Sequence, residues 1–274
     1  MPIGYIFDIE FVWGFQSRIV GLSKTSPSFY YPPPTTILGA IAEAIAKEHN
    51  ISESNGKKII PLLSNNLLAI GLKPINCLPI KYEDLNRIIS VKITSGELYP
   101  DPKDLRKSFD SPASGKTIFS TFDNNSATLR CFIVFKKDKV LFDDKNIAID
   151  ENIFWHIHRV GSKESIVSIS DVKKMPNLVI NKGSVTTNYS FTKTKGVNLK
   201  NEIVKRWGAE NYIDPFNIKT YVPIKDYIFR ENLVEYLIPI KVSHLSEPTY
   251  YVELDNNFVC YQYDNEKVIG KWLE

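Results

Sequence analysis

Three consecutive prolines, Pro32–Pro34, constrain the fold of this chain more than any other feature. Because proline fixes its φ angle and lacks a backbone N–H, this run cannot lie inside a helix or a central strand. The apolar residues after it have the spacing of one helical face: Ile37, Leu38, Ile41 and Ile45. We therefore predict a helix that starts at the prolines and ends near residue 50, with Thr35 or Thr36 as its N-cap.

Gly39 falls early in this predicted helix, where glycine costs about 1 kcal/mol relative to alanine. Two explanations are open: the turn packs closely on a sheet, or a ligand approaches the backbone there. A helix N-terminus with free N–H groups and threonine hydroxyls is also suited to binding phosphate.

The first 172 residues have the element order of an α+β domain. Alternating polarity over residues 3–13 predicts a strand, and further strands are expected at 67–72, 87–94, 129–136 and 166–170. A short helix is expected over 150–159, capped by Asp150 and ended by Gly161. Residues 95–127 are too long for an ordinary turn and predict a projecting arm. With that arm set aside, the order is the split β-α-β pattern of a ferredoxin-like fold.

Residues 173–274 are expected to form a second, mainly antiparallel β region. Within it, residues 250–254 and 258–263 flank Asp255-Asn-Asn257, which predicts a hairpin.

Composition excludes several classes of protein. The content of 43% hydrophobic and 24% charged residues is that of an ordinary globular protein. Three widely spaced cysteines without a C-x-x-C pair indicate neither a disulfide framework nor a cysteine zinc site. The acidic start of the chain and the lack of a long apolar run argue against a signal peptide and a membrane span. We expect a cytoplasmic protein without a cofactor or metal.

Positive charge is concentrated in one segment. Residues 159–206 hold ten basic and three acidic residues, a net charge of +7 where the whole chain has +3. Such asymmetry is typical of nucleic-acid binding, although a solvated lysine-rich face gives the same pattern. Tyr189, Phe191 and Trp207 lie among these lysines, and aromatic rings can stack on unpaired bases.

Two histidines, His156 and His158, lie just before the sequence Arg159-Val-Gly-Ser-Lys-Glu-Ser165. Their i, i+2 spacing and the lack of a third ligand make a zinc site unconvincing. Either histidine could act as a general base on a 2′-hydroxyl, with Arg159 or Lys163 stabilising the charge that develops. The other interpretation is packing or phosphate contact, for which the Gly-Ser-Lys turn is also suited.

Three motifs together resemble the Cas-five family of RAMP-superfamily subunits in type I CRISPR Cascade complexes. They are Trp13-Gly-Phe15, Pro27-Ser-Phe-Tyr-Tyr-Pro-Pro-Pro-Thr-Thr-Ile-Leu-Gly-Ala40 and Arg159-Val-Gly-Ser-Lys-Glu-Ser165. The resemblance covers about the first 170 residues and is weak over the C-terminal third. It implies an RRM-like fold at 1–172 with a long β-hairpin thumb at about 95–127. The triple proline and the long C-terminal part suggest an archaeal-type complex of subtype I-A or I-D.

The resemblance also implies a function and partners. A subunit of this kind caps the 5′ handle of the CRISPR RNA, contacts the Cascade backbone subunit and large subunit, and meets target DNA only indirectly in antiviral defence. We expect no catalysis; the alternative is the metal-independent endoribonuclease activity that the family has in one subtype.

We expect the RNA to lie between the helix start and the loop at 159–163, with help from the preceding loop and the arm. The candidate RNA-binding residues are Arg18, Lys24, Thr35, Thr36, Arg106, Lys107, Lys116, His158, Arg159, Ser162 and Lys163.

Overall fold

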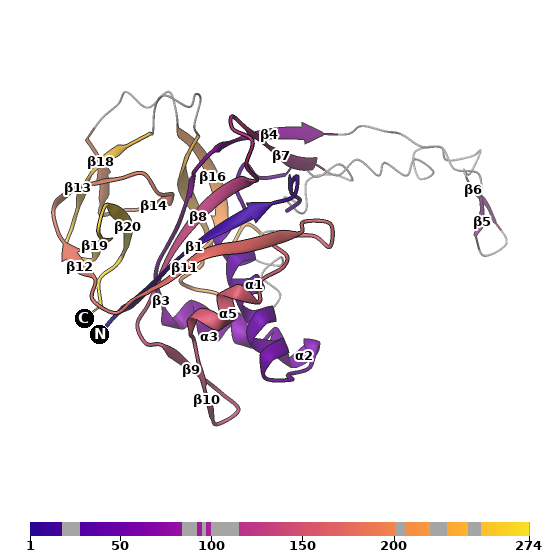
Figure 1. The fold of residues 1–274 in the computed structure, drawn as a ribbon, viewed down its shortest axis with the longest axis horizontal. Helices are drawn as coiled ribbons and strands as arrows, with labels where there is room; N and C mark the ends of the chain where they lie inside the picture. The colour runs from indigo at the N-terminus through magenta and orange to yellow at the C-terminus, as the bar shows by residue number, and fades with distance from the viewer. Residues whose placement is uncertain are drawn as a thin grey trace.

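The computed structural model is built mainly of antiparallel sheet with few helices (Figure 1). It describes residues 1–17, 28–83, 92–94, 97–99, 115–200, 207–219, 229–240 and 248–273. The helices are α1 (Pro34–Glu48), α2 (Glu53–Gly56), α3 (Ile59–Asn66) and α5 (Glu151–Trp155). None of these helices is both long and apolar enough to cross a membrane.

A seven-stranded sheet forms the centre of the molecule, in the order β11-β1-β8-β3-β20-β19-β12. Its strands are β11 (Val167–Met175), β1 (Ile3–Phe11), β8 (Ala127–Phe135), β3 (Leu67–Pro74), β20 (Glu266–Lys271), β19 (Phe258–Tyr263) and β12 (Val179–Asn181). All neighbouring strands are antiparallel. Strands from both ends of the sequence therefore share one sheet, and β11 runs across residue 172.

The two faces of β1 enter different cores, because successive side chains of a strand point to opposite sides of the sheet. Tyr5, Phe7 and Ile9 are fully buried in a large cluster that also contains the apolar face of α1. Ile6 points to the other side, into a smaller cluster with Met175 and Tyr189. In Figure 1 the helices gather on one side of the sheet, and strands β12, β13, β14, β18, β19 and β20 lie at the left of the view.

Helix α1 has the apolar face that the sequence predicts, but a different cap. Ile37, Leu38, Ile41 and Ile45 are buried. The helix begins at Pro34 and its N-cap is Pro33, so the prediction of a threonine cap is wrong. Proline is suited to the first helical position because the N–H that it lacks would have no partner within the helix.

Helix α5 is capped as predicted, because the Asp150 carboxylate accepts hydrogen bonds from the N–H groups of Asn152 and Ile153. It is shorter than predicted, since His156 is its C-cap. His158 and Arg159 consequently lie on a loop and not on a helix.

A three-stranded sheet joins β2 (Gly14–Phe15), β7 (Gly115–Thr121) and β4 (Cys77–Glu83). Strand β7 lies inside the segment predicted as an arm, yet its Thr117 and Phe119 are buried. Strands β5 (Lys92–Thr94) and β6 (Glu97–Tyr99) pair with each other. The remaining residues of the predicted arm before Gly115, and residues 87–91 of the predicted strand, lie outside the described residues.

The C-terminal region contains two further three-stranded sheets, β13-β18-β15 and β14-β17-β16. Their strands are β13 (Ser184–Thr187), β18 (Tyr250–Leu254), β15 (Val197–Leu199), β14 (Phe191–Lys193), β17 (Leu233–Pro239) and β16 (Trp207–Ile213). A separate hairpin pairs β9 (Lys139–Phe142) with β10 (Lys145–Ala148).

The hairpin predicted across Asp255-Asn-Asn257 is wrong. Strand β18 pairs with β13 and β15, whereas β19 pairs with β20 and β12. The turn is real, because the Asp255 carboxylate accepts from the Asn257 N–H. It carries the chain from one sheet to another, an outcome that turn residues alone do not distinguish from a hairpin.

Candidate functional site

The loop that follows α5 is held against the end of β1 and β2. The Trp13 indole N–H donates to the Glu164 carbonyl at 2.8 Å. The Ser162 N–H donates to the Gln16 carbonyl at 3.0 Å, and the Gln16 N–H donates to the Ser165 hydroxyl at 2.9 Å. Two of the three sequence motifs noted above are therefore in direct contact.

Gly161 is required by this contact. It has a φ of 112°, and a Cβ placed on it would lie 2.7 Å from the Gln16 carbonyl oxygen. The prediction that Gly161 ends α5 is wrong, because the helix has already ended six residues earlier, at Trp155. The glycine instead permits the close approach of two backbones.

Arg159 lies against α1 and binds Glu43. Its Nη2 donates to both oxygens of the Glu43 carboxylate at 2.9 Å. The Lys47 ammonium is 3.0 Å from the same carboxylate, and it also lies 3.2 Å from Nε2 of His158. The loop and helix thus bring two cations and a histidine around one acid.

Glu43 stays ionised in this cluster. Burial by itself would raise the pKa of this carboxyl, but the hydrogen bonds from Lys47 and Arg159 outweigh burial and hold the pKa below its ordinary value. Arg159 therefore has much of its charge compensated within the protein.

A cavity of about 500 Å³ lies between α1, α2, α3 and this loop. We call it the α1–loop cavity. Its charged lining residues are Glu43, Lys47, Glu53, Lys57, Arg159 and Lys163. Four cations and two acids give it a net positive charge. Lys163 is exposed and has no carboxylate within 4.0 Å among the residues that the structure describes.

Gly39 is part of the wall of the α1–loop cavity. A Cβ added there would meet no atom within 4 Å, so the explanation of Gly39 by close packing is wrong. The other explanation, approach of a ligand to the backbone, agrees with its place beside open space.

The two threonines predicted to lie beside this loop are at the start of α1, N-terminal to the residue that the loop contacts. Thr35 and Thr36 are half-buried, and the Thr36 N–H donates to the Pro33 carbonyl at 2.8 Å. Glu43, the contact of Arg159, is ~12 Å along the helix axis from Thr35. The structure therefore joins Arg159, Lys163 and His158 to the middle of α1, and Ser162 to Gln16.

The other predicted residues are more scattered. Lys116 is exposed on β7, and its ammonium lies 5.9 Å from the centre of the Trp13 ring. Arg18, Lys24, Arg106 and Lys107 lie outside the described residues.

Part of the basic segment is compensated by acids from elsewhere in the chain. Lys193 pairs with Glu235 at 3.2 Å and Lys200 with Glu253 at 3.4 Å. The prediction that Tyr189 and Phe191 stack on bases is wrong, because both side chains are almost fully buried.

His156 and His158 are both exposed, but only His158 lies beside other site residues. Within the described ranges, no group of three His, Cys, Asp or Glu residues could hold a metal ion.

Sequence reasoning missed Glu43, Lys47 and Lys57. A usable signal was present for the first two, since Glu43 and Lys47 are spaced i, i+4 on the polar side of a predicted helix. Lys57 has the same i, i+4 spacing from Glu53, but its place at the cavity depends on how α2 packs against α1.

The whole chain is similar to known CRISPR proteins. No protein-family model matches the chain. It is 45% identical to a CRISPR protein from Archaeoglobus fulgidus of known crystal structure, covering 98% of this chain and 100% of that one, with a TM-score of 0.73.

Curated relatives from Saccharolobus solfataricus bear Cas5 names. CRISPR-associated protein Cas5 3 is 26% identical, and CRISPR system aCascade subunit Cas5 1 is 25% identical; each match covers 81% of this chain and 88% of the relative. CRISPR-associated protein Cas5 2 is 26% identical over 59% of this chain, and the match spans only 57% of that relative's length.

Proposed function

This chain belongs to the Cas5 family of CRISPR-associated proteins, and we propose that it is a non-catalytic RNA-binding subunit of a Cascade complex. In this role it caps the 5′ handle of the CRISPR RNA in the cytoplasm. It contacts the backbone and large subunits of an archaeal-type complex of subtype I-A or I-D, and meets target DNA only indirectly. The observation that carries the proposal is the whole-length similarity to a CRISPR protein, and it is supported by Lys163, which lines a positively charged cavity and has no acidic partner among the described residues.

The proposal includes a ferredoxin-like, RRM-like unit within residues 1–172. It is supported by the chain order β1, α1, β3, β8, α5, β11 and by the spatial order β11-β1-β8-β3. An antiparallel sheet in this order with two helices on one face is the arrangement that the split β-α-β pattern specifies. The thumb at about 95–127 remains part of the proposal. A deletion that tests it must end before Gly115, because Thr117 and Phe119 belong to the core.

The RNA is proposed to contact the α1–loop cavity through Lys163 and Arg159. Lys163 is exposed and uncompensated among the described residues, whereas Arg159 must share its guanidinium between Glu43 and a phosphate. A guanidinium has several N–H donors in a planar fork, so Nη2 can stay on Glu43 while its other N–H groups bind phosphate.

The test is the affinity for a repeat-derived RNA at several salt concentrations. The variants are Lys163→Ala alone and Lys163→Ala combined with Arg159→Ala. Each lost phosphate contact should lower affinity and reduce the slope of log affinity against log salt by about 0.7. The matched control is Lys139→Ala with Lys145→Ala, since both lysines are exposed on the β9–β10 hairpin. If the double variant at 159 and 163 keeps the wild-type affinity and slope, the RNA lies elsewhere.

One observation favours the alternative function, a metal-independent endoribonuclease. Nε2 of His158 lies 3.2 Å from the Lys47 ammonium at the rim of a positively charged cavity, an arrangement that can move a proton and stabilise a phosphate. Incubation of the purified protein with repeat RNA in EDTA separates the two functions. Site-specific cleavage that is lost in His158→Ala supports the enzyme, whereas binding without cleavage supports the cap.

A further inference from the structure

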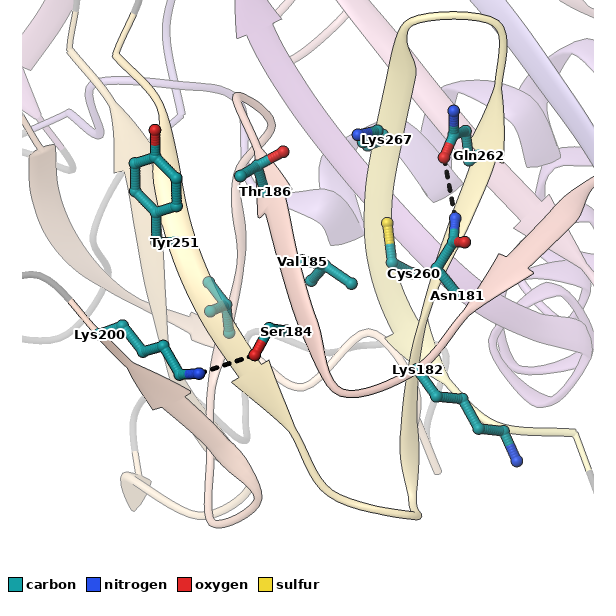
Figure 2. Close-up of a pocket in the computed structure, with 11 residues that line it drawn as sticks. Asn181, Lys182, Ser184, Val185, Thr186, Lys200, Tyr251, Cys260, Gln262 and Lys267 are labelled. Carbon is teal, nitrogen blue, oxygen red and sulfur yellow. Dashed lines mark hydrogen bonds between the residues drawn. The ribbon is translucent and has the colours of Figure 1, made fainter.

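A second cavity lies in the C-terminal region, away from α1 and its loop. It has a volume of about 320 Å³ and lies where β13 and β18 face β12 and β19 (Figure 2). A smaller cavity of about 160 Å³ continues from it, and Thr186, Gln262 and Lys267 line both. We call these two adjoining cavities together the β13–β19 groove. Its larger part has the size of a small ligand-binding pocket.

The charges in this groove are of one sign. Lys182, Lys200 and Lys267 line it, and no Asp or Glu does so within the part of the chain that the structure describes. Lys200 is partly compensated, since it lies 3.4 Å from Glu253 outside the lining and donates to the Ser184 hydroxyl at 2.7 Å. Figure 2 shows this hydrogen bond at one end of the groove.

Within the described part of the chain, the other two lysines have no acidic partner. Lys182 stacks over the Trp272 ring at 4.0 Å from its centre, and Lys267 is half-buried. Among the described residues, neither has a carboxylate within 4.0 Å. The Cys260 thiol nearby cannot serve as a counter-charge at neutral pH. Burial raises its pKa to about 12, although the charge of Lys267 opposes that rise.

Neutral hydrogen-bonding groups complete the lining. Asn181 and Gln262 bind each other at 2.8 Å, and Ser184 and Thr186 also line the groove, with the Ser184 hydroxyl turned to Lys200 (Figure 2). Tyr251 also lines the groove and is 49% exposed, so its side chain is accessible to a ligand. Lysines, hydroxyls and an exposed aromatic ring are the groups that bind unpaired nucleic acid without reading its sequence.

We propose that the β13–β19 groove binds the phosphate backbone of an unpaired nucleic-acid strand. Lys267 and Lys182 supply the positive charge, the hydroxyls of Ser184 and Thr186 donate to phosphate oxygens, and Tyr251 stacks on an adjoining base. Because Lys267 lines both cavities, the groove is suited to a ligand that is longer than a single phosphate group. This strand-binding site uses none of the residues of the α1–loop cavity, so it goes beyond the function proposed above.

The probe is a fluorescein-labelled dT12 oligonucleotide, and the readout is fluorescence anisotropy with the full-length chain. Lys267→Gln should weaken binding and lower the salt slope by about 0.7, as expected for one lost phosphate contact on a single strand. Tyr251→Ala should weaken binding by at least about fivefold through lost stacking, without changing the salt slope. Lys267→Arg keeps the charge and should retain binding.

Lys145→Gln is the matched control, because it removes one exposed lysine far from the groove in sequence. Unfolding midpoints in urea establish that each variant is folded. A photo-crosslinkable dT12 analogue should label the peptide that contains Tyr251, and Lys145→Gln should leave that labelling unchanged.

Two results would overturn the proposal. One is equal loss of affinity in Lys267→Gln and Lys145→Gln. The other is displacement of dT12 by inorganic phosphate at the same total phosphate concentration, which would mean a simple anion site.

Discussion

Arg130 on β8 binds Asp8 on β1 through two hydrogen bonds, from Nε to Oδ1 at 2.6 Å and from Nη2 to Oδ2 at 2.7 Å. The same guanidinium donates to Glu266 on β20 at 2.9 Å and lies 3.3 Å from Asp171 on β11. One side chain thereby connects four strands of the central sheet. Because acids from both ends of the sequence meet on it, the two regions of the chain are joined electrostatically as well as by strand pairing.

Replacement of Arg130 by Met should destabilise the protein by about 3 kcal/mol, because it leaves the nearly buried Asp8 carboxylate without its partner. Urea unfolding measures the loss. Asp8→Asn in the Arg130→Met background should recover part of it, since the uncompensated charge is then gone. If Arg130→Met lowers the free energy of unfolding no more than Lys145→Met does, the ion pairs of Arg130 contribute little to stability.

Stability should fall in acid through Glu266. Burial tends to raise the pKa of this carboxyl, but Lys73, Arg130 and Tyr189 more than offset burial and hold the pKa below 4.5. A lowered folded-state pKa gives stability that is present above the unfolded pKa and lost as the pH drops through the folded one. The free energy of unfolding, measured from pH 6 to pH 3, should therefore decrease more steeply in the wild type than in Glu266→Gln. Parallel curves would contradict this.

Replacement of Gly14 and of Gly39 by alanine should change the stability of the protein in opposite directions. Gly14 has a φ of 146°, and a Cβ there would lie 2.0 Å from the Thr117 carbonyl oxygen, so Gly14→Ala should separate β2 from β7 and destabilise the protein by at least about 2 kcal/mol. Gly39→Ala meets no atom within 4 Å and should stabilise α1 by about 1 kcal/mol. Thermal unfolding of the two variants side by side provides the comparison, and shifts of the same sign would refute it.

Glu210 on β16 should control the start of α1. Its carboxylate accepts from the Tyr30 N–H at 2.9 and 3.0 Å, from the Lys81 ammonium at 2.9 Å and from the Tyr212 hydroxyl at 2.6 Å. Glu210→Gln keeps the shape but weakens these bonds, with an expected loss of about 2 kcal/mol.

Hydrogen exchange should localise that effect. The Tyr30 amide should lose protection in Glu210→Gln, whereas amides in β1 should change only with global stability. Unchanged protection at Tyr30 would mean that the prolines alone fix this segment.

Local pattern was enough to predict several elements of this fold. The apolar face of α1, the buried face of β1 that carries Tyr5, Phe7 and Ile9, and the Asp150 cap follow from periodicity and side-chain chemistry within a few residues. The partners of β18 and β19 did not follow, because strand pairing depends on contacts far apart in sequence. In the same way, the Arg159 motif was noticed, but its contact with Glu43 depends on the packing of a loop on a helix more than a hundred residues away.

The position of β20 has a consequence for how this protein forms during synthesis. Gly270 pairs with Ala69, and the Lys73 ammonium binds Glu266 across 193 positions of sequence. While the ribosome is still making the C-terminal region, β3 has a partner on one side only and presents an open edge to other nascent chains. The central sheet is therefore completed only after residues 266–271 have emerged from the ribosome. A ribosome stalled before them would display a β3 edge that a peptide with the sequence of β20 could occupy.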